Sequence, residues 1–122
     1  MINLLQFAAA AFAIALAGGL GSVLRLLLSR WVGILPWGIL AANSIASLFA
    51  GLAVIAADGF WAAILVTGVM GGLSTFSSWA AATGEIWQSG KRARATSYGL
   101  LTLVIPTLMA WGGQYVAALL IK

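Results

Sequence analysis

Residues 68–79 read Gly-Val-Met-Gly-Gly-Leu-Ser-Thr-Phe-Ser-Ser-Trp, and this stretch lies within a chain that is otherwise almost entirely apolar. The paired glycines are followed by a run of hydroxyl and aromatic residues, and a glycine in a helix interior costs roughly 1 kcal/mol relative to alanine. At membrane depth, irregular backbone is tolerated only where it is buried in protein or lines a polar cavity. We therefore expect a membrane helix broken at Gly71–Thr75, and we expect this break to be the working part of the molecule.

The composition of the rest of the chain indicates a membrane protein. Of the 122 residues, 63% are hydrophobic and only 7% are charged, against about 25% charged in soluble domains. Four stretches without formal charge reach the roughly 20 residues that a membrane-crossing helix needs: Leu4–Leu24, Gly38–Ala57, Phe60–Gly84 and Thr96–Ile121. The sequence predicts an all-α membrane protein, with residues 1–122 in a single four-helix transmembrane domain and spans at about 4–28, 36–57, 60–84 and 96–121. We expect the first span to remain in the protein, because the start lacks the positive charges of a cleaved signal peptide.

Cations gather on one side of the predicted spans. The connections after the first and third spans carry five of the six Lys and Arg residues, namely Arg25, Arg30, Lys91, Arg92 and Arg94, whereas Lys122 lies on the other side. The positive-inside rule places these connections in the cytoplasm and both termini outside, so we expect a multi-pass protein of the cell inner membrane. The chain has no cysteine and no histidine, which excludes disulfides and His/Cys metal sites.

No Asp, Glu, Lys, Arg or His lies well inside any predicted span, whereas uncharged polar residues do. An embedded acid or base is usual in proton-coupled exporters, so its absence argues against that class. The amide of Asn43 needs partners, and either an interhelical hydrogen bond or a bound ligand can supply them. Phe76 and Trp79 share a helix face, where their positive ring edges either favour a small anion or simply pack. Carbonyl oxygens freed at the break can hold a small hard cation.

Small residues recur at four-residue spacing, in the pairs Gly68 and Gly72, Gly18 and Ser22, and Ser47 and Gly51. This spacing lets membrane helices approach one another closely. Four short spans barely enclose a cavity, so we expect a dimer to bury these faces together with the polar residues.

Three segments resemble one known family. Residues 71–79, Gly-Gly-Leu-Ser-Thr-Phe-Ser-Ser-Trp, resemble the GGLTTFSTF signature of the CrcB (Fluc) fluoride channels. Residues 18–25, Gly-Gly-Leu-Gly-Ser-Val-Leu-Arg, are similar to the GGxxGAxxR segment of their first helix. Residues 36–43, Pro-Trp-Gly-Ile-Leu-Ala-Ala-Asn, followed by Ser47 and Gly51, are similar to their P-x-GTLxxNxxGSxxxG element. The segments occur in the family's order and span essentially the whole chain.

The resemblance implies a four-helix subunit, its third helix broken, in an antiparallel, dual-topology dimer with two fluoride pathways and one central sodium ion. It assigns the fluoride pathway to Asn43, Phe76, Ser77, Ser78, Trp79 and Tyr98, the sodium ion to the backbone carbonyls of Gly71 and Ser74, and the arginine at the end of the first helix to Arg25. In this assignment Asn43 donates to fluoride, and Phe76 is the first of two phenylalanines whose ring edges face the anion.

Two departures from the family pattern lie next to this pathway. Trp79 replaces the second phenylalanine, and Ala82 stands where the family usually has a glutamate. The larger indole either narrows the pathway or offers fluoride a strong N–H donor. We expect the indole to narrow the pathway, because Ala82 also indicates that the usual residues of this pathway are not strictly required here.

The resemblance thus predicts a passive fluoride-selective channel that exports fluoride from the cytoplasm, and not an enzyme. The alternatives are a non-conducting or partner subunit of a heterodimeric fluoride channel, and a small proton-coupled exporter. The expected partners are fluoride, a second subunit in a homodimer or a heterodimer, and the lipid bilayer, but not nucleic acid.

Overall fold

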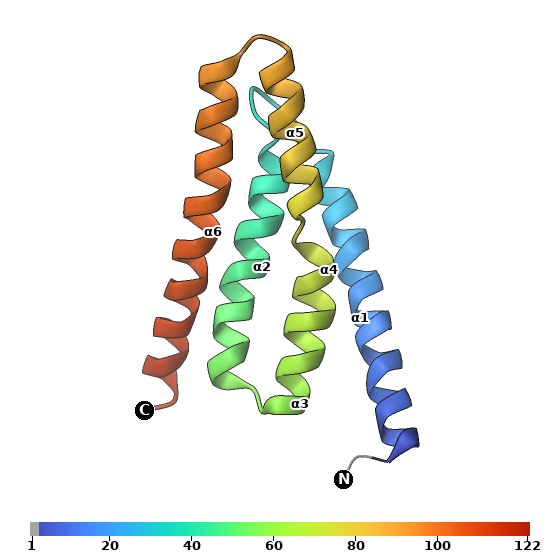
Figure 1. The fold of residues 1–122 in the computed structure, drawn as a ribbon. Coiled ribbons are helices and arrows are strands. Elements are labelled where there is room, and N and C mark those ends of the chain that lie inside the picture. Colours follow the sequence, from blue (N-terminus) through green and yellow to red (C-terminus); the bar gives the residue numbers. More distant parts are fainter. Residues whose placement is uncertain (1–2) are drawn as a thin grey trace.

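The computed structural model of the protein describes residues 3–122, which are helical apart from short connections. Four spans are long and apolar enough to cross a membrane, as predicted: Leu4–Ser29, Trp37–Ala56, Gly59–Gln88 and Arg92–Leu120. The first two are α1 and α2, and the last is α6. The third consists of α3 (Gly59–Ala62), a π-helical segment (Ala63–Met70), α4 (Gly71–Leu73) and α5 (Phe76–Gln88). The spans lie side by side with α2 in the middle (Figure 1).

Local sequence sets the ends of these helices. At the start of α1, the Asn3 side chain accepts from the Gln6 N–H at 2.8 Å and the Gln6 side chain accepts from the Asn3 N–H at 3.1 Å, a reciprocal capping box. Between α5 and α6, Gly90 has a φ of +83°, a left-handed conformation that favours glycine. This tight turn allows α5 to continue to Gln88 and α6 to begin at Arg92, both beyond the predicted limits of the spans.

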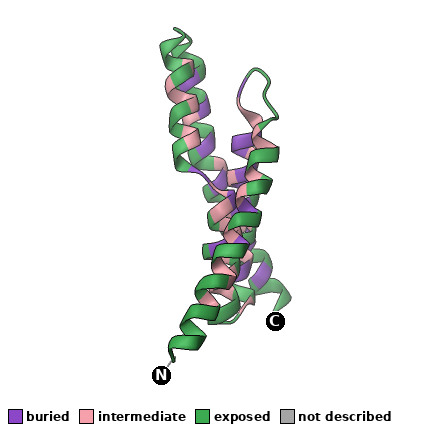
Figure 2. Cartoon of the chain, turned by 90° about the vertical axis from the view of Figure 1, so that its right-hand side faces the viewer, coloured by how far each residue is buried: buried purple, intermediate pink, exposed green. Residues whose placement is uncertain are grey.

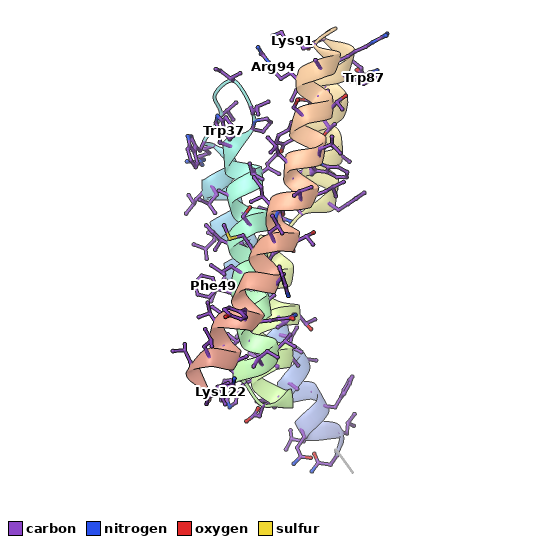
Figure 3. All side chains as sticks on the ribbon, turned by 90° about the vertical axis from the view of Figure 1, so that its left-hand side faces the viewer. Trp37, Phe49, Trp87, Lys91, Arg94 and Lys122 are labelled. Carbon is purple, nitrogen blue, oxygen red and sulfur yellow. The ribbon has the colours of Figure 1, made fainter. Side chains whose placement is uncertain are left out.

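Lysine and arginine residues mark the two ends of the bundle. Both termini are at the same end in Figure 1. Figure 3 shows Lys91 and Arg94 at one end of the bundle, near Trp87, and Lys122 at the other. The Arg92 guanidinium lies over the Trp87 ring, 5.4 Å from its centroid. This is the arrangement predicted from the distribution of Lys and Arg along the chain.

Glycines bring the helices into backbone contact, as the small-residue spacing predicted. A Cβ at Gly72 would lie 2.2 Å from the Gly18 carbonyl oxygen, and one at Gly51 would lie 2.1 Å from the Ala110 carbonyl oxygen. A Cβ at Gly68 would lie 2.7 Å from a side chain of α1. Close approach is thus confirmed between α1 and the third span, and between α2 and α6.

Burial is concentrated between the helices, and large apolar side chains cover the outside. Figure 2 shows the buried residues along the inner faces and exposed residues over much of the remaining surface. The exposed side chains include Leu16, Phe49 and Trp111, and Phe49 points outward between the ends of the bundle in Figure 3. An apolar exterior of this kind suits a lipid environment.

The third span is broken, as predicted, but over fewer residues. Gly71–Leu73 stays helical, and the Ser74 N–H still donates to the Met70 carbonyl at 2.9 Å. Ser74 (φ −74°, ψ 152°) and Thr75 (φ −151°, ψ 121°) are extended, and the helix resumes at Phe76. Figure 1 shows this gap between α4 and α5 about midway along the bundle.

Candidate functional site

The amide of Asn43 spans the break. Asn43 projects from α2 toward the break in the third span. Its Nδ2 donates to the Thr75 carbonyl at 3.1 Å, and its Oδ1 accepts from the Thr75 N–H at 2.7 Å. Thr75 is buried, with 7% of its surface exposed, and Asn43 is partly buried. The sequence left open whether Asn43 makes an interhelical hydrogen bond or binds a ligand. The structure shows that the interhelical hydrogen bond is present and that it is made to backbone rather than to a side chain.

The Thr75 hydroxyl caps the helix that follows the break. It accepts from the Ser78 N–H at 3.1 Å and donates to the Ser78 hydroxyl at 3.0 Å. The side-chain oxygen of an N-cap threonine satisfies one of the unpaired amides at a helix start. Thr75 was not among the predicted site residues, although it lay within the predicted break. Its position three residues before Ser78, at the expected start of a helix, is the pattern of an N-cap threonine and could have identified it.

These bonds free two backbone carbonyls. In a continuous helix the Thr75 N–H would donate to the Gly71 carbonyl and the Ser78 N–H to the Ser74 carbonyl. Here the first donates to Asn43 and the second to the Thr75 hydroxyl. Gly71 and Ser74 are the two residues whose carbonyls the family resemblance assigns to a cation, and both lack their usual helical partner.

A groove of about 460 Å³ opens beside the break, between α2, α5 and α6. Its lining combines polar and apolar groups: Asn43, Ser47, Ser74, Thr75, Phe76, Trp79, Thr102, Leu103, Pro106, Thr107 and Ala110. A smaller depression of about 150 Å³ lies next to it and includes Gly71. Ser47 and Ser74 line both, so the groove reaches the region of the freed carbonyls.

None of the described residues that line the groove has an ionisable side chain. The α6 residues Thr102 and Thr107 donate their hydroxyl hydrogens to the Tyr98 and Leu103 carbonyls of their own helix, at 2.9 and 2.7 Å. These two threonines were not predicted as site residues, because a hydroxyl on a membrane helix commonly bonds its own backbone and gives no distinct signal.

Phe76 and Trp79 form the aromatic part of the groove. Their ring centroids are 4.9 Å apart and the rings are tilted by 57°. Phe76 is 74% exposed, so its ring faces away from the subunit core. Trp79 is partly buried, and its Nε1 is a buried atom that makes no hydrogen bond within residues 3–122. The indole N–H is therefore turned away from the open groove.

The structure places other predicted residues elsewhere. Arg25, Ser77 and Ser78 line a second depression of about 390 Å³ between α1, α2 and α5, together with Ser22 and Ser29. The serines at the start of α5 thus lie on a different side of the break from the Asn43 groove.

Tyr98 is fully buried and does not line the groove. It belongs to a core cluster with Leu35 and Leu40, against which Trp79 and Ala82 pack. Its hydroxyl makes no hydrogen bond within the described residues 3–122. The structure does not bring Tyr98 together with Asn43 and Phe76.

The chemistry available at the break suits small ions of either sign. Freed carbonyls are oxygen ligands of the kind that hard cations take, and amide hydrogens and aromatic edges attract anions. Among residues 3–122, no group of three or more His, Cys, Asp or Glu side chains lies together. A cation at the break would therefore depend on the backbone carbonyls.

Comparison with known proteins gives one consistent family. A family model described as "CrcB-like protein, Camphor Resistance (CrcB)" matches residues 12–114. The fluoride-specific ion channel FluC of Leptospira interrogans is 31% identical over 122 residues, covering 91% of this chain and 96% of the relative. The FluC of Thermus thermophilus is 35% identical, covering 88% and 93%, and that of Agrobacterium fabrum is 35% identical, covering 82% and 89%. The four spans, the broken third helix and this similarity over most of the chain identify the protein as a multi-pass membrane protein of the CrcB family.

Proposed function

We propose that the protein is a fluoride-selective channel subunit, through which fluoride leaves the cytoplasm down its electrochemical gradient without chemical conversion. The observation that carries this proposal is the Asn43 amide beside a mid-span helix break, in a groove of hydroxyls and aromatic rings with no ionisable side chain. The relatives' shared name, fluoride-specific ion channel, supports fluoride as the anion.

In this proposal, the side chains of the groove make different interactions with fluoride. Fluoride is small and strongly hydrated, so donors at close range must replace its water. The Asn43 Nδ2 uses one hydrogen for the Thr75 carbonyl, and its second hydrogen is available to an anion. The Phe76 ring offers a positive edge. Neutral donors bind weakly enough to let the ion leave again, which conduction requires.

The assembly that we propose is an antiparallel dimer. Phe76 is 74% exposed on the wall of an open groove, so a second subunit is needed to close the pathway around its ring. The five-to-one distribution of Lys and Arg favours a single orientation for this chain. This distribution therefore supports a heterodimer with a partner chain of opposite charge bias as the alternative to a homodimer.

A structural sodium ion at the dimer axis is the third part of the proposal. The freed Gly71 and Ser74 carbonyls would hold it, and their oxygen chemistry fits a hard cation. When bound, the ion supplies positive potential near the break. The chain's own contribution is to keep these carbonyls out of helical hydrogen bonds.

The test of function is ion efflux from liposomes that contain the purified protein. Fluoride efflux should greatly exceed chloride efflux and should follow the fluoride gradient without any imposed pH gradient. Protein-free liposomes measure leakage, and Asn43→Asp, whose carboxyl group replaces the amide donor, should reduce the flux while the size-exclusion profile stays unchanged. Comparable fluoride and chloride efflux would refute fluoride selectivity, and flux that requires a pH gradient would point to the proton-coupled exporter.

A second liposome experiment separates the two assemblies. Flux from this chain purified alone supports the homodimer. Flux that appears only when a chain of opposite charge bias is added supports the heterodimer.

A further inference from the structure

Asn43 contacts the backbone of a single residue with both of its polar atoms. The two bonds, of 3.1 and 2.7 Å, join the amide to the carbonyl and the N–H of Thr75. A two-point contact fixes the plane of the Thr75 backbone as well as its position. It comes from α2, the most buried of the four spans.

This contact decides where the Thr75 N–H donates. A buried backbone N–H takes whatever partner is within reach, because an unpaired one is costly. Four residues earlier, the Gly71 carbonyl would be that partner in a regular helix. By accepting from the Thr75 N–H, Asn43 keeps the Gly71 carbonyl free and Thr75 extended (φ −151°, ψ 121°).

The hydroxyl of the same threonine frees the second carbonyl. Because the Ser78 N–H donates to Thr75 Oγ1 at 3.1 Å, it does not close onto the Ser74 carbonyl. The carbonyl oxygens of Gly71 and Ser74 therefore both remain free because of the way Thr75 is bonded, and Asn43 holds the backbone of Thr75.

We propose that Asn43, acting through Thr75, is a positioning residue for the cation site, in addition to its proposed role as an anion donor. This inference rests on the proposed function, since the cation at Gly71 and Ser74 is part of it. The two roles divide within one side chain: Oδ1 and one Nδ2 hydrogen hold the backbone of Thr75, and the second Nδ2 hydrogen is the one offered to fluoride. The cation site and the anion pathway are thereby linked through a single amide.

The test measures sodium binding by stability and needs no flux. The thermal unfolding midpoint of the purified assembly is recorded as sodium chloride replaces choline chloride at constant ionic strength. For wild type, sodium should raise the midpoint in a saturable way. For Asn43→Ala, which removes both bonds, the half-saturating sodium concentration should rise by about 10- to 100-fold, the usual effect of losing a residue that orients metal ligands.

Four further variants separate positioning from general loss of structure. Asn43→Asp retains an oxygen that accepts from the Thr75 N–H but loses the donor to the Thr75 carbonyl, so its half-saturating sodium concentration should lie between those of wild type and Asn43→Ala, while fluoride flux is lost. Thr75→Val removes the hydroxyl that occupies the Ser78 N–H and should weaken the response, whereas Thr75→Ser should restore it. Ser44→Ala is the matched control on α2, because the buried Ser44 hydroxyl makes no hydrogen bond within residues 3–122; its response should equal that of wild type.

The outcomes distinguish this inference from the proposals on which it rests. A wild-type protein without any sodium response refutes the cation site itself, whatever its fluoride flux. A wild-type response that is unchanged in Asn43→Ala and in Thr75→Val overturns the positioning role. If Asn43→Ala fails to fold, Asn43→Asp decides the question, because a half-saturating sodium concentration equal to that of wild type overturns the positioning role.

Discussion

Replacing Gly21 by alanine should separate α1 from the third span next to the break. A Cβ at this position would lie 2.2 Å from the Val69 carbonyl oxygen and 2.9 Å from the Leu73 backbone nitrogen. The first distance is more than about 1 Å shorter than normal van der Waals contact, and both neighbours are backbone atoms that no rotamer change can move. Overpacking of this kind costs about 1–3 kcal/mol in the free energy of unfolding.

Gly19→Ala is the matched control, two residues away on the same helix, since a Cβ there has nothing within 4 Å. Both variants gain the same helix propensity of up to about 1 kcal/mol, so their difference isolates the steric clash. Reversible unfolding in mixed micelles measures that difference directly. We expect Gly21→Ala to be less stable than Gly19→Ala by about 1–3 kcal/mol, and to conduct less fluoride because Leu73 precedes the break. Equal stability of the two variants would show that α1 does not pack against the third span as described.

Three further predictions follow from single side chains. Trp79→Phe should raise fluoride flux per assembly, because the smaller ring widens the groove and the buried Nε1 lost with the indole makes no hydrogen bond to residues 3–122; a lower flux with assembly intact would show that the indole N–H serves the anion. Tyr98→Phe should leave stability unchanged or raise it, since the buried hydroxyl that is removed has no partner in the described part of the chain, and an unfolding free energy lowered by more than about 1 kcal/mol would contradict this. Gly113→Ala should destabilise the contact between α6 and α2, where a Cβ would lie 2.2 Å from the Leu48 carbonyl oxygen, whereas Gly112→Ala should not; unfolding of the two variants side by side checks this.

Much of the architecture could be predicted from the sequence. Hydropathy and charge fixed the number of spans and the side on which the cations gather, because the cost of placing charge or unpaired backbone in hydrocarbon leaves few alternatives. The paired glycines and hydroxyl residues marked the position of the break. The exact extent of the break was not predictable, since Gly71 and Gly72 are helical and only Ser74 and Thr75 are extended.

The structure brings some of the predicted site residues together and separates others. Asn43, Phe76 and Trp79, predicted for the fluoride pathway, line one groove, and Ser74, predicted for the cation, lines it as well. Ser77, Ser78 and Arg25 line a different depression, and Tyr98 lies in the core. Residues that share a helix turn or a family motif can face different neighbours, and the facing helices are known only after packing.

The sequence by itself determined that this chain crosses a membrane four times, that its third span is interrupted, and which family it resembles. The first two properties follow from composition and from local backbone preference, and the resemblance follows from three sequence motifs. Only the tertiary structure decided what Asn43 does at the break. Its partner, Thr75, is 32 residues away along the chain, and whether an amide meets that backbone depends on how closely α2 packs beside α4 and α5. Close backbone contact at the glycines sets such distances, and that contact is a property of helix pairs rather than of any single segment.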